Sequence, residues 1–167
     1  MAELTSGVNP LFLRDEELRQ GIEFFLVAYK DFAADADRDL ERAGLGRAHH
    51  RVLYFVGRNP GIAVGELLAI LGITKQSLSR SLSELLSRGL IAERPGPADR
   101  RRKLLTLTPE GEALERRLTE RQRARIARAY REAGAEAVEG FRKVVLGMID
   151  EGGRVRFAAR DREGPGT

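Results

Sequence analysis

Residues Val64–Gly89 read VGELLAILGITKQSLSRSLSELLSRG, which contains two short segments with apolar residues at helical spacing. Gly72 separates the segments, Thr74 can cap the second one, and Gly89 can end it in the left-handed conformation. Two short helices joined by a tight, glycine-containing turn form a helix-turn-helix. The apolar positions that define the two predicted helices are Val64, Leu67, Leu68 and Leu71 in the first and Leu78, Leu82, Leu85 and Leu86 in the second.

After Gly89 the pattern changes from helical spacing to strand-like segments. Residues 90–94 and 103–107 predict two short strands, and the loop between them is too long for a tight hairpin turn, so it should project as a wing. Thr108 can then cap a further helix in which Pro109 takes the first position. The stretch from about Ala63 to Thr108 therefore predicts a winged helix-turn-helix.

Long amphipathic segments flank this core. A continuous apolar stripe and an acidic first turn predict one helix over residues 15–42, and a second helix is expected over about 47–57. A long helix from Pro109 and a final helix over about 135–150 follow the wing. The stripes on the first and last helices exceed what the small core can cover, so two chains are expected to bury them together as a homodimer.

Composition excludes several classes of protein. The 167 residues carry a net charge of +4 and no cysteine, which removes disulfides, thiolate metal sites and cysteine nucleophiles. No stretch is apolar enough to span a bilayer and residues 1–10 do not resemble a secretory leader, so a cytoplasmic protein without membrane contact is expected. Hydrolase, phosphate-loop and metalloprotease motifs are missing, which predicts no enzymatic activity, no cofactor and no metal site.

The outward face of the second helix carries polar side chains suited to DNA. With the leucines facing inward, Gln76, Arg80 and Ser83 point to the opposite side. Glutamine can bind an adenine edge and arginine a guanine edge through two hydrogen bonds each, and the first turns of a recognition helix meet the bases. We therefore expect base contacts from Gln76, Ser77 and Arg80. Lys75 and Ser83 should contact the phosphate backbone, although an ordinary solvated helix can carry the same residues.

The predicted wing is basic, because four consecutive cations, from Arg100 to Lys103, follow the single acidic residue Asp99. An arginine gains from the negative potential of a narrow minor groove. A charge run is often only a solvated loop, but this one lies one strand beyond a helix-turn-helix, so both elements would face one duplex. The full set of predicted DNA-binding residues is Thr74, Lys75, Gln76, Ser77, Ser79, Arg80, Ser83, Asp99, Arg100, Arg101, Arg102 and Lys103.

The predicted fold is mainly α with a small β-wing, namely a winged helix-turn-helix core with long N- and C-terminal dimerisation helices. Five parts are expected along the chain. They are an N-terminal arm (1–14), N-terminal helices for dimerisation and support (15–58), the DNA-binding region (59–108), C-terminal dimerisation helices (109–150) and a flexible tail (151–167).

The region from Ala63 to Gly111 resembles the winged-helix core of the MarR family of bacterial transcription regulators. The family's wing signature is Asp, any residue and Arg, then five residues and Leu-Thr, and here it corresponds to Asp99, Arg101, Leu107 and Thr108. The segment Gly46–Arg58 also resembles the PetP-like (LdtR-like) subgroup. The family resemblance implies that Asp99 orients Arg101, that Arg101 enters the minor groove, and that the long helices form the dimer.

The resemblance further implies a repressor that releases DNA when a small effector binds near the dimerisation helices. Because the sequence contains no cysteine, thiol oxidation is excluded as its switch. The residues expected to line such an effector site are Tyr29, His49, His50, Tyr54 and Phe55. Adjacent histidines on a helix point about 100° apart. His49 and His50 therefore suit one metal poorly, and one packed and one partly exposed histidine is the plainer interpretation.

Two other classes of function remain open from the sequence. A winged helix can serve as a protein-interaction module without touching DNA, and that class would be expected to present an acidic or apolar recognition face. A winged helix that binds RNA is the other possibility. The leading prediction is a regulator that binds double-stranded DNA as a homodimer on a pseudo-palindromic operator.

Overall fold

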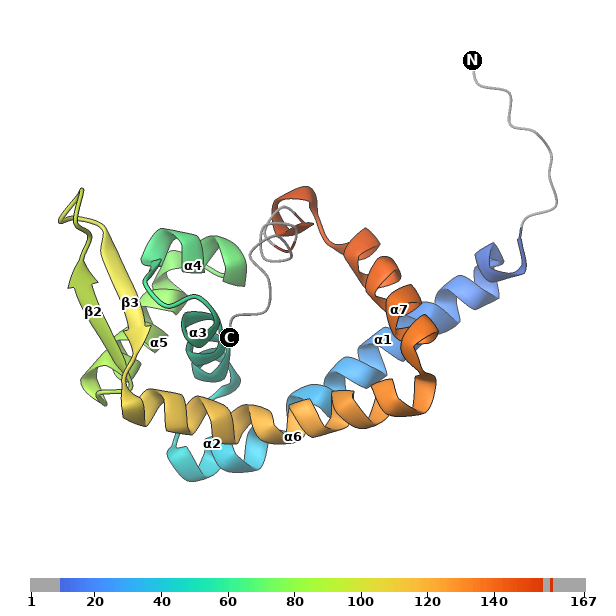
Figure 1. The fold of residues 1–167 in the computed structure, drawn as a ribbon, viewed down its shortest axis with the longest axis horizontal. Helices are drawn as coiled ribbons and strands as arrows, with labels where there is room; N and C mark the ends of the chain where they lie inside the picture. Colours follow the sequence, from blue (N-terminus) through green and yellow to red (C-terminus); the bar gives the residue numbers. More distant parts are fainter. Residues whose placement is uncertain (1–9, 155–156, 158–167) are drawn as a thin grey trace, which may run out of the picture.

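The computed structural model describes residues 10–154 and 157, and it confirms a mainly helical fold with a small antiparallel sheet (Figure 1). In chain order the elements are the 3-10 turn η1 (Leu11–Leu13), α1 (Asp15–Ala34), α2 (Asp37–Ala43), α3 (Arg47–Arg58), β1 (Ile62–Ala63), α4 (Val64–Leu71), α5 (Lys75–Ser87), β2 (Ile91–Pro95), β3 (Lys103–Leu107), α6 (Pro109–Ala133) and α7 (Ala135–Met148).

The helix-turn-helix forms as the sequence predicts. Helix α4 ends at Gly72, which is left-handed with φ 60°. The side chain of Thr74 then caps α5 by accepting a hydrogen bond from the backbone N–H of Ser77. Gly89 follows α5 with φ 68°, a conformation that glycine adopts at little cost. Leu78, Leu82 and Leu85 are buried, so the predicted inward face of this helix is confirmed.

The sheet has three strands in the order β1-β3-β2, all antiparallel. Strands β2 and β3 lie within one residue of their predicted bounds and pair from Ile91 with Leu107 to Pro95 with Lys103. Strand β1 was not predicted. It has only two residues, Ile62 and Ala63, opposite Leu105 and Leu104, and so short a strand has no detectable alternation of its own.

The first predicted helix is two helices, which corrects the expected single span of 15–42. Helix α1 ends at Ala34 and α2 begins at Asp37. At the break the carboxylate of Asp35 accepts two hydrogen bonds, of 2.5 and 2.9 Å, from Arg125 of α6. Asp37 likewise accepts two from Arg47 of α3. Hydrogen bonds to α6 and α3 thus accompany the break. The apolar spacing of residues 15–42 does not indicate either arginine partner.

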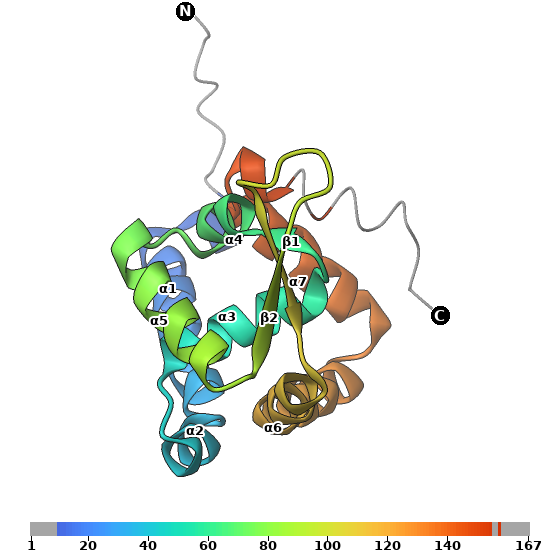
Figure 2. The same ribbon diagram turned by 90° about the vertical axis from the view of Figure 1, so that its left-hand side faces the viewer.

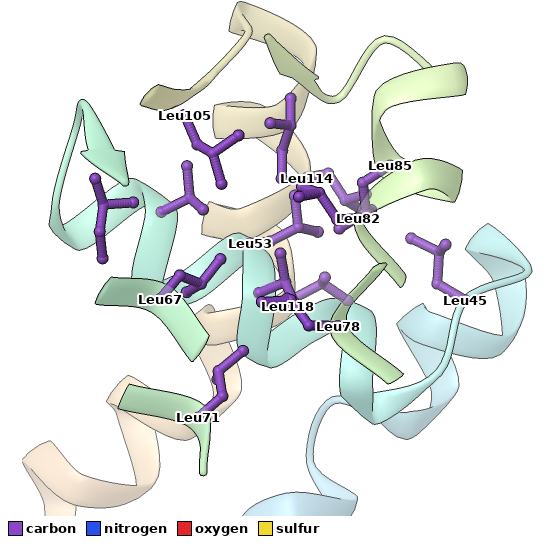
Figure 3. Packing of buried hydrophobic residues seen from close by; sticks show 14 of the residues in the cluster. Leu45, Leu53, Leu67, Leu71, Leu78, Leu82, Leu85, Leu105, Leu114 and Leu118 are labelled. Carbon is purple, nitrogen blue, oxygen red and sulfur yellow. The ribbon is translucent and has the colours of Figure 1, made fainter. Parts of the chain in front are cut away.

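The core lies beneath the sheet and gathers one leucine-rich face from each surrounding helix (Figure 3). Leu53 of α3 is fully buried at its centre. Around it lie leucines of α4, α5, β3 and α6, namely Leu67, Leu78, Leu82, Leu85, Leu105, Leu114 and Leu118. Burying a leucine side chain contributes about 1.5–3 kcal/mol, so these contacts fix α5 on the platform formed by α3 and α6.

Helix α6 joins the core through a tight junction at its first turn. Thr108 accepts a hydrogen bond from the backbone N–H of Gly111 at 3.1 Å and donates its hydroxyl to the carbonyl of Gly89 at 2.6 Å. Its own backbone N–H donates to the carbonyl of Leu90 at 3.1 Å. The expected N-cap is confirmed, and the same residue also ties α6 to the end of the helix-turn-helix.

Helices α1 and α7 and the second half of α6 extend away from this core (Figure 1). Ala33 is the only buried residue of α1, and no residue of α7 is buried among those described. The apolar stripe of α1 is correspondingly exposed, with Leu18 at 49%, Ile22 at 62% and Phe25 at 47%. A single chain therefore leaves these faces uncovered.

The two ends of the chain lie partly outside the described residues. Of the predicted N-terminal arm, residues 1–9 are not described. Of the predicted flexible tail, Glu151–Arg154 are helical, which differs from the expectation, and Phe157 is also helical. Residues 155, 156 and 158–167 of the tail lie outside the described part.

Candidate nucleic-acid interface

The outward face of α5 presents most of the predicted DNA-binding side chains together. Lys75, Gln76, Ser79, Arg80 and Ser83 are all exposed and line one shallow groove along the helix. Thr74 and Ser77, also predicted, are engaged in the N-cap, where their hydroxyls are 2.8 Å apart. The groove residues are therefore available to a duplex, whereas Thr74 and Ser77 first serve to start the helix.

The wing is a closed loop between β2 and β3. The backbone N–H of Gly96 donates to the carbonyl of Arg102 at 2.6 Å, and the N–H of Arg102 donates to the carbonyl of Asp99 at 3.0 Å. The Asp99 carboxylate accepts the backbone N–H of Arg101 at 2.9 Å. Asp99 thus contacts the main chain of Arg101, which shapes the loop that carries this arginine.

The four wing cations differ in how they are held. Arg102 donates to the Glu66 carboxylate of α4 at 2.7 Å, and Lys103 donates to Glu93 of β2 at 2.5 Å. Within the described part of the chain, Arg100 and Arg101 form no ion pair, and both are exposed. Two of the four predicted cations are therefore free for a phosphate or a groove, and the other two would first have to leave a carboxylate.

Helix α5 and the wing lie at the same end of the molecule, which faces the viewer in Figure 2. Strand β2 packs against α5, so the groove residues and the free wing arginines belong to one packed unit. This arrangement offers a polar, basic surface made of a helix and a loop.

The inner flank of α5 is fixed by a network that the sequence did not reveal. Nε2 of His49 in α3 lies 2.9 Å from a carboxylate oxygen of Glu84, and the other oxygen accepts a hydrogen bond from Arg88 at 2.5 Å. Arg88 also donates to the carbonyls of Ala43 and Gly44. The Arg88 hydrogen bond lowers the pKa of Glu84, so the carboxylate is charged at neutral pH. These bonds orient α5 on α2 and α3.

Four of the five residues predicted to line an effector site surround one cavity of about 350 Å³ between α1, α3 and α6. They are Tyr29, His50, Tyr54 and Phe55, whereas His49 is not in the lining and contacts Glu84 instead. The cavity is also lined by residues that were not singled out, namely Phe32, Ala33, Arg47, Arg51, Thr119, Gln122, Arg123 and Ile126. Phe32 and Ile126 fall on the predicted apolar stripes of α1 and α6, which is the signal that could have found them.

His50 is the most unusual lining residue. It is 8% exposed, and its Nε2 atom has no hydrogen-bond partner among the described residues. Burial lowers the pKa of this imidazole below its ordinary 6.5, because a charged ring loses its hydration there. His50 is therefore neutral at pH 7 and leaves a polar atom to be satisfied inside the cavity.

The free energy of unfolding is expected to fall as the pH drops below about 6.5 because of His50. The unfolded chain binds a proton near the ordinary pKa, whereas the folded chain binds it only at a lower pH. Between the two pKa values the unfolded state holds more protons and gains in stability. Urea unfolding from pH 7.5 down to about 5 measures this slope, and His50→Gln should flatten it. An unchanged slope in that variant would show that His50 does not titrate in this way.

The described residues provide neither a cluster of metal-ligating side chains nor a membrane-spanning helix. No group of three or more His, Cys, Asp or Glu side chains lies close enough to hold a metal ion among residues 10–154 and 157. In the same part of the chain, no helix combines the length and apolar character needed to cross a membrane.

Comparison with known proteins places the chain in a family. The MarR family profile matches residues 43–102. The HTH-type transcriptional regulator PetP of Rhodobacter capsulatus is 50% identical over 144 residues, which cover 86% of this chain and 87% of PetP.

Solved structures show the same fold. A MarR family transcriptional regulator from Silicibacter pomeroyi has a TM-score of 0.66 at 22% identity, with 80% of this chain and 88% of that chain covered. A mutant MarR from E. coli, solved with operator DNA, has a TM-score of 0.60 at 21% identity and covers 85% of this chain and 100% of its own. Since half of the aligned residues match those of PetP over most of both chains, this protein belongs to the MarR family of transcriptional regulators.

Proposed function

We propose that the protein binds double-stranded DNA in a sequence-specific manner and regulates transcription without catalysing a reaction. One observation carries this proposal, namely the exposed groove of Lys75, Gln76 and Arg80 on α5 at the same end as the free wing arginines. The outward face of α5 is polar and basic, which disfavours a module that binds only protein. The solved MarR relative with operator DNA supports the same function.

The exposed helices support a homodimer as the working form. Apolar side chains that lie uncovered on α1 and α7, such as Ile22, Phe25 and Phe141, would be buried against a second copy. A two-fold dimer places its recognition helices in successive major grooves, roughly 34 Å apart, so the operator should be a pseudo-palindrome. In this arrangement residues 59–108 read DNA, and residues 15–58 and 109–150 support the reading unit and form the dimer.

The cavity supports regulation by a small molecule. It lies between α3, which packs on α5, and the helices α1 and α6 that extend to the proposed dimer interface. A ligand that alters the angle between these parts changes the spacing of the two recognition helices and hence the affinity for DNA. We propose that the protein is a ligand-responsive repressor that acts in the cytoplasm.

Genomic footprinting with the purified full-length protein tests this function. Protected pseudo-palindromic sites, together with a sedimentation mass twice the 18.6 kDa of one chain, would support a dimeric DNA-binding protein. If no genomic site were protected and the protein captured single-stranded or structured RNA, RNA binding would replace DNA binding as its function. A monomeric mass would contradict the two-fold arrangement.

Operator affinity is expected to fall steeply with salt. Each neutralised phosphate contributes about −0.9 to the slope of log K against log salt. Lys75 and Arg100, exposed on α5 and on the wing, are expected to contact phosphates in each protomer. The slope for the dimer should then be about −4 or steeper. Titration of the footprinted duplex at several salt concentrations measures it, and a flat dependence would argue against contact with the phosphate backbone.

A further inference from the structure

Three charged residues lie one helical turn apart along the recognition helix α5 and its C-terminal cap. Arg80, Glu84 and Arg88 follow one another at a spacing of four residues, which places neighbouring members about 40° apart on one strip of the helix surface. Side chains at this spacing are neighbours, so the Glu84 carboxylate lies within reach of both arginines. Its choice between them decides whether Arg80 stays available to DNA.

Glu84 pairs with Arg88 and leaves Arg80 free. One carboxylate oxygen of Glu84 accepts a hydrogen bond of 2.5 Å from Arg88. Arg80 is exposed, and its side chain forms no ion pair with any described residue. A glutamate that precedes its arginine along a helix is the more favourable order, and a cation suits the C-terminal end. Exposed pairs of this kind contribute little by themselves, so further contacts are needed to hold Glu84 on this side.

His49 of α3 supplies one of these contacts. The backbone N–H of Gly46 donates to Nδ1 of His49 at 3.0 Å, so this nitrogen is an acceptor. The proton of the neutral ring is then on Nε2, which donates to the second oxygen of Glu84 at 2.9 Å. The imidazole is only 16% exposed, and hydrogen bonds to both of its nitrogens fix its orientation. Each oxygen of Glu84 is thus held by a group other than Arg80.

Arg88 is itself anchored to the end of α2. It donates to the backbone carbonyls of Ala43 and Gly44 at 2.8 and 3.1 Å. Gly44 ends α2 in the left-handed conformation, with φ 64°. Carbonyls at the end of a helix lack partners within the helix, and a cation there is favourable. These bonds keep the guanidinium beside α2, so Arg88 draws the Glu84 carboxylate away from the groove residues.

A Glu84 side chain without these partners would interfere with base reading. A carboxylate can bind an arginine through two parallel hydrogen bonds, and an arginine engaged in this way is not available to a guanine edge. We propose that His49 and Arg88 are positioning residues for DNA reading, which hold the Glu84 carboxylate on the α2 and α3 side and so keep Arg80 free for a base. This inference rests on the proposed function, because it names the residues that prepare its recognition helix.

The test compares one substitution in two backgrounds of the full-length protein, with the footprinted operator and a scrambled duplex of equal length. Arg88→Met should raise the operator Kd by roughly fivefold or more, the lower end of what one base-reading side chain contributes. The scrambled duplex should be affected less. In protein that already carries Glu84→Gln, Arg88→Met should change the operator Kd by less than about twofold, because no carboxylate remains to capture Arg80.

Arg117→Met is the matched control for the lost charge. Arg117 of α6 lines the same surface hollow as Arg88, is exposed, and forms no ion pair among the described residues. Its removal should therefore raise the operator Kd less than removal of Arg88. Equal losses in the two variants would show that only the local charge matters, which would contradict a role for Glu84.

Substitutions of His49 test the second contact. His49→Leu removes the donor to Glu84 and should raise the operator Kd, though by less than Arg88→Met, because Arg88 still holds one oxygen. His49→Gln, whose amide can still donate to Glu84, should restore much of the affinity. Equal affinities of the Leu and Gln variants would show that His49 does not act through this hydrogen bond.

A measurement on the unmodified protein needs no variant that has to fold. Nitrogen NMR of arginine side chains distinguishes a guanidinium that rotates freely from one that a carboxylate holds. The guanidinium of Arg88 should rotate slowly and that of Arg80 freely. In Arg88→Met, rotation of the Arg80 guanidinium should become slow as Glu84 pairs with it.

Three results would overturn the proposal. They are equal losses on Arg88→Met with and without Glu84→Gln, no loss on Arg88→Met, and slow rotation of Arg80 in the unmodified protein. In each case, operator binding by the unmodified protein would leave the regulator function intact. Failure of the unmodified protein to bind any footprinted duplex would instead disprove that function itself.

Discussion

Gly111→Ala is expected to lower the free energy of unfolding by about 2 kcal/mol or more. A Cβ atom at Gly111 would lie 1.9 Å from the carbonyl oxygen of Leu90 and 2.9 Å from its carbonyl carbon. Both are backbone atoms, and that carbonyl already accepts the N–H of Thr108, so it cannot move aside without breaking the junction. The helical propensity of alanine would favour the change by about 1 kcal/mol, but the collision outweighs it.

Thermal unfolding at a fixed protein concentration measures this effect, because the melting temperature of a dimer depends on concentration. For a chain of this size each kcal/mol corresponds to roughly 2–4 °C. Gly65→Ala is the matched control, since a Cβ at Gly65 meets no atom within 4 Å, and it should leave the melting temperature equal or slightly higher. If Gly111→Ala had the same melting temperature as the wild type, the close approach of α6 to Leu90 would not exist in solution.

Gly111 also illustrates what the sequence could not predict. Thr108 and Pro109 predicted the start of a helix that contains Gly111, and the structure confirms that start. The reason that this position needs a glycine is a tertiary contact, which the local sequence does not indicate. Gly111 lies within a helix, without a positive φ, and is required only because the backbone at Leu90 passes so close. Local propensity would have favoured alanine at this position.

Elements whose signals are local were predicted well. The caps at Thr74 and Thr108, the left-handed Gly89 and the leucine face of α5 all depend on residues within a few positions of one another. At the helix break, Asp35 is paired with Arg125, which lies far along the chain. The apolar stripe runs on through the break and does not specify which neighbour each carboxylate will meet, so local spacing could not place the break.

In the candidate site, too, local features could be predicted from the sequence and tertiary contacts could not. The sequence indicated which side chains of α5 face outward, because helical geometry alone decides it. The charge pattern of the wing could not show that Arg102 forms an ion pair while Arg101 does not, since the difference arises from Glu66, a carboxylate on α4. The sequence could not separate the roles of His49 and His50 either, because those depend on what packs above each ring. Whether any of these side chains contacts DNA stays a prediction.

Arg101→Ala is expected to weaken operator binding by about 1–3 kcal/mol, which corresponds to roughly a fivefold to 150-fold higher Kd. Arg101 is exposed, forms no ion pair among the described residues, and is carried by a loop that Asp99 holds through the Arg101 backbone N–H. The side chain can therefore reach a narrow minor groove without first breaking a salt bridge. Because Asp99 already holds the loop, the loop loses less conformational entropy when it binds DNA. A gel-shift titration of the footprinted duplex measures the change.

Arg102→Ala provides the matched control, because it removes an equal charge from the neighbouring position. Arg102 donates to Glu66 at 2.7 Å, so Arg102 could reach DNA only after that ion pair breaks. Substitution of Arg102 should therefore weaken DNA binding less than substitution of Arg101. Equal losses in the two variants would mean that the wing acts only through its total charge. A full loss in Arg102→Ala with none in Arg101→Ala would mean that Glu66 releases Arg102 on binding, and that Arg102 is the residue in the groove.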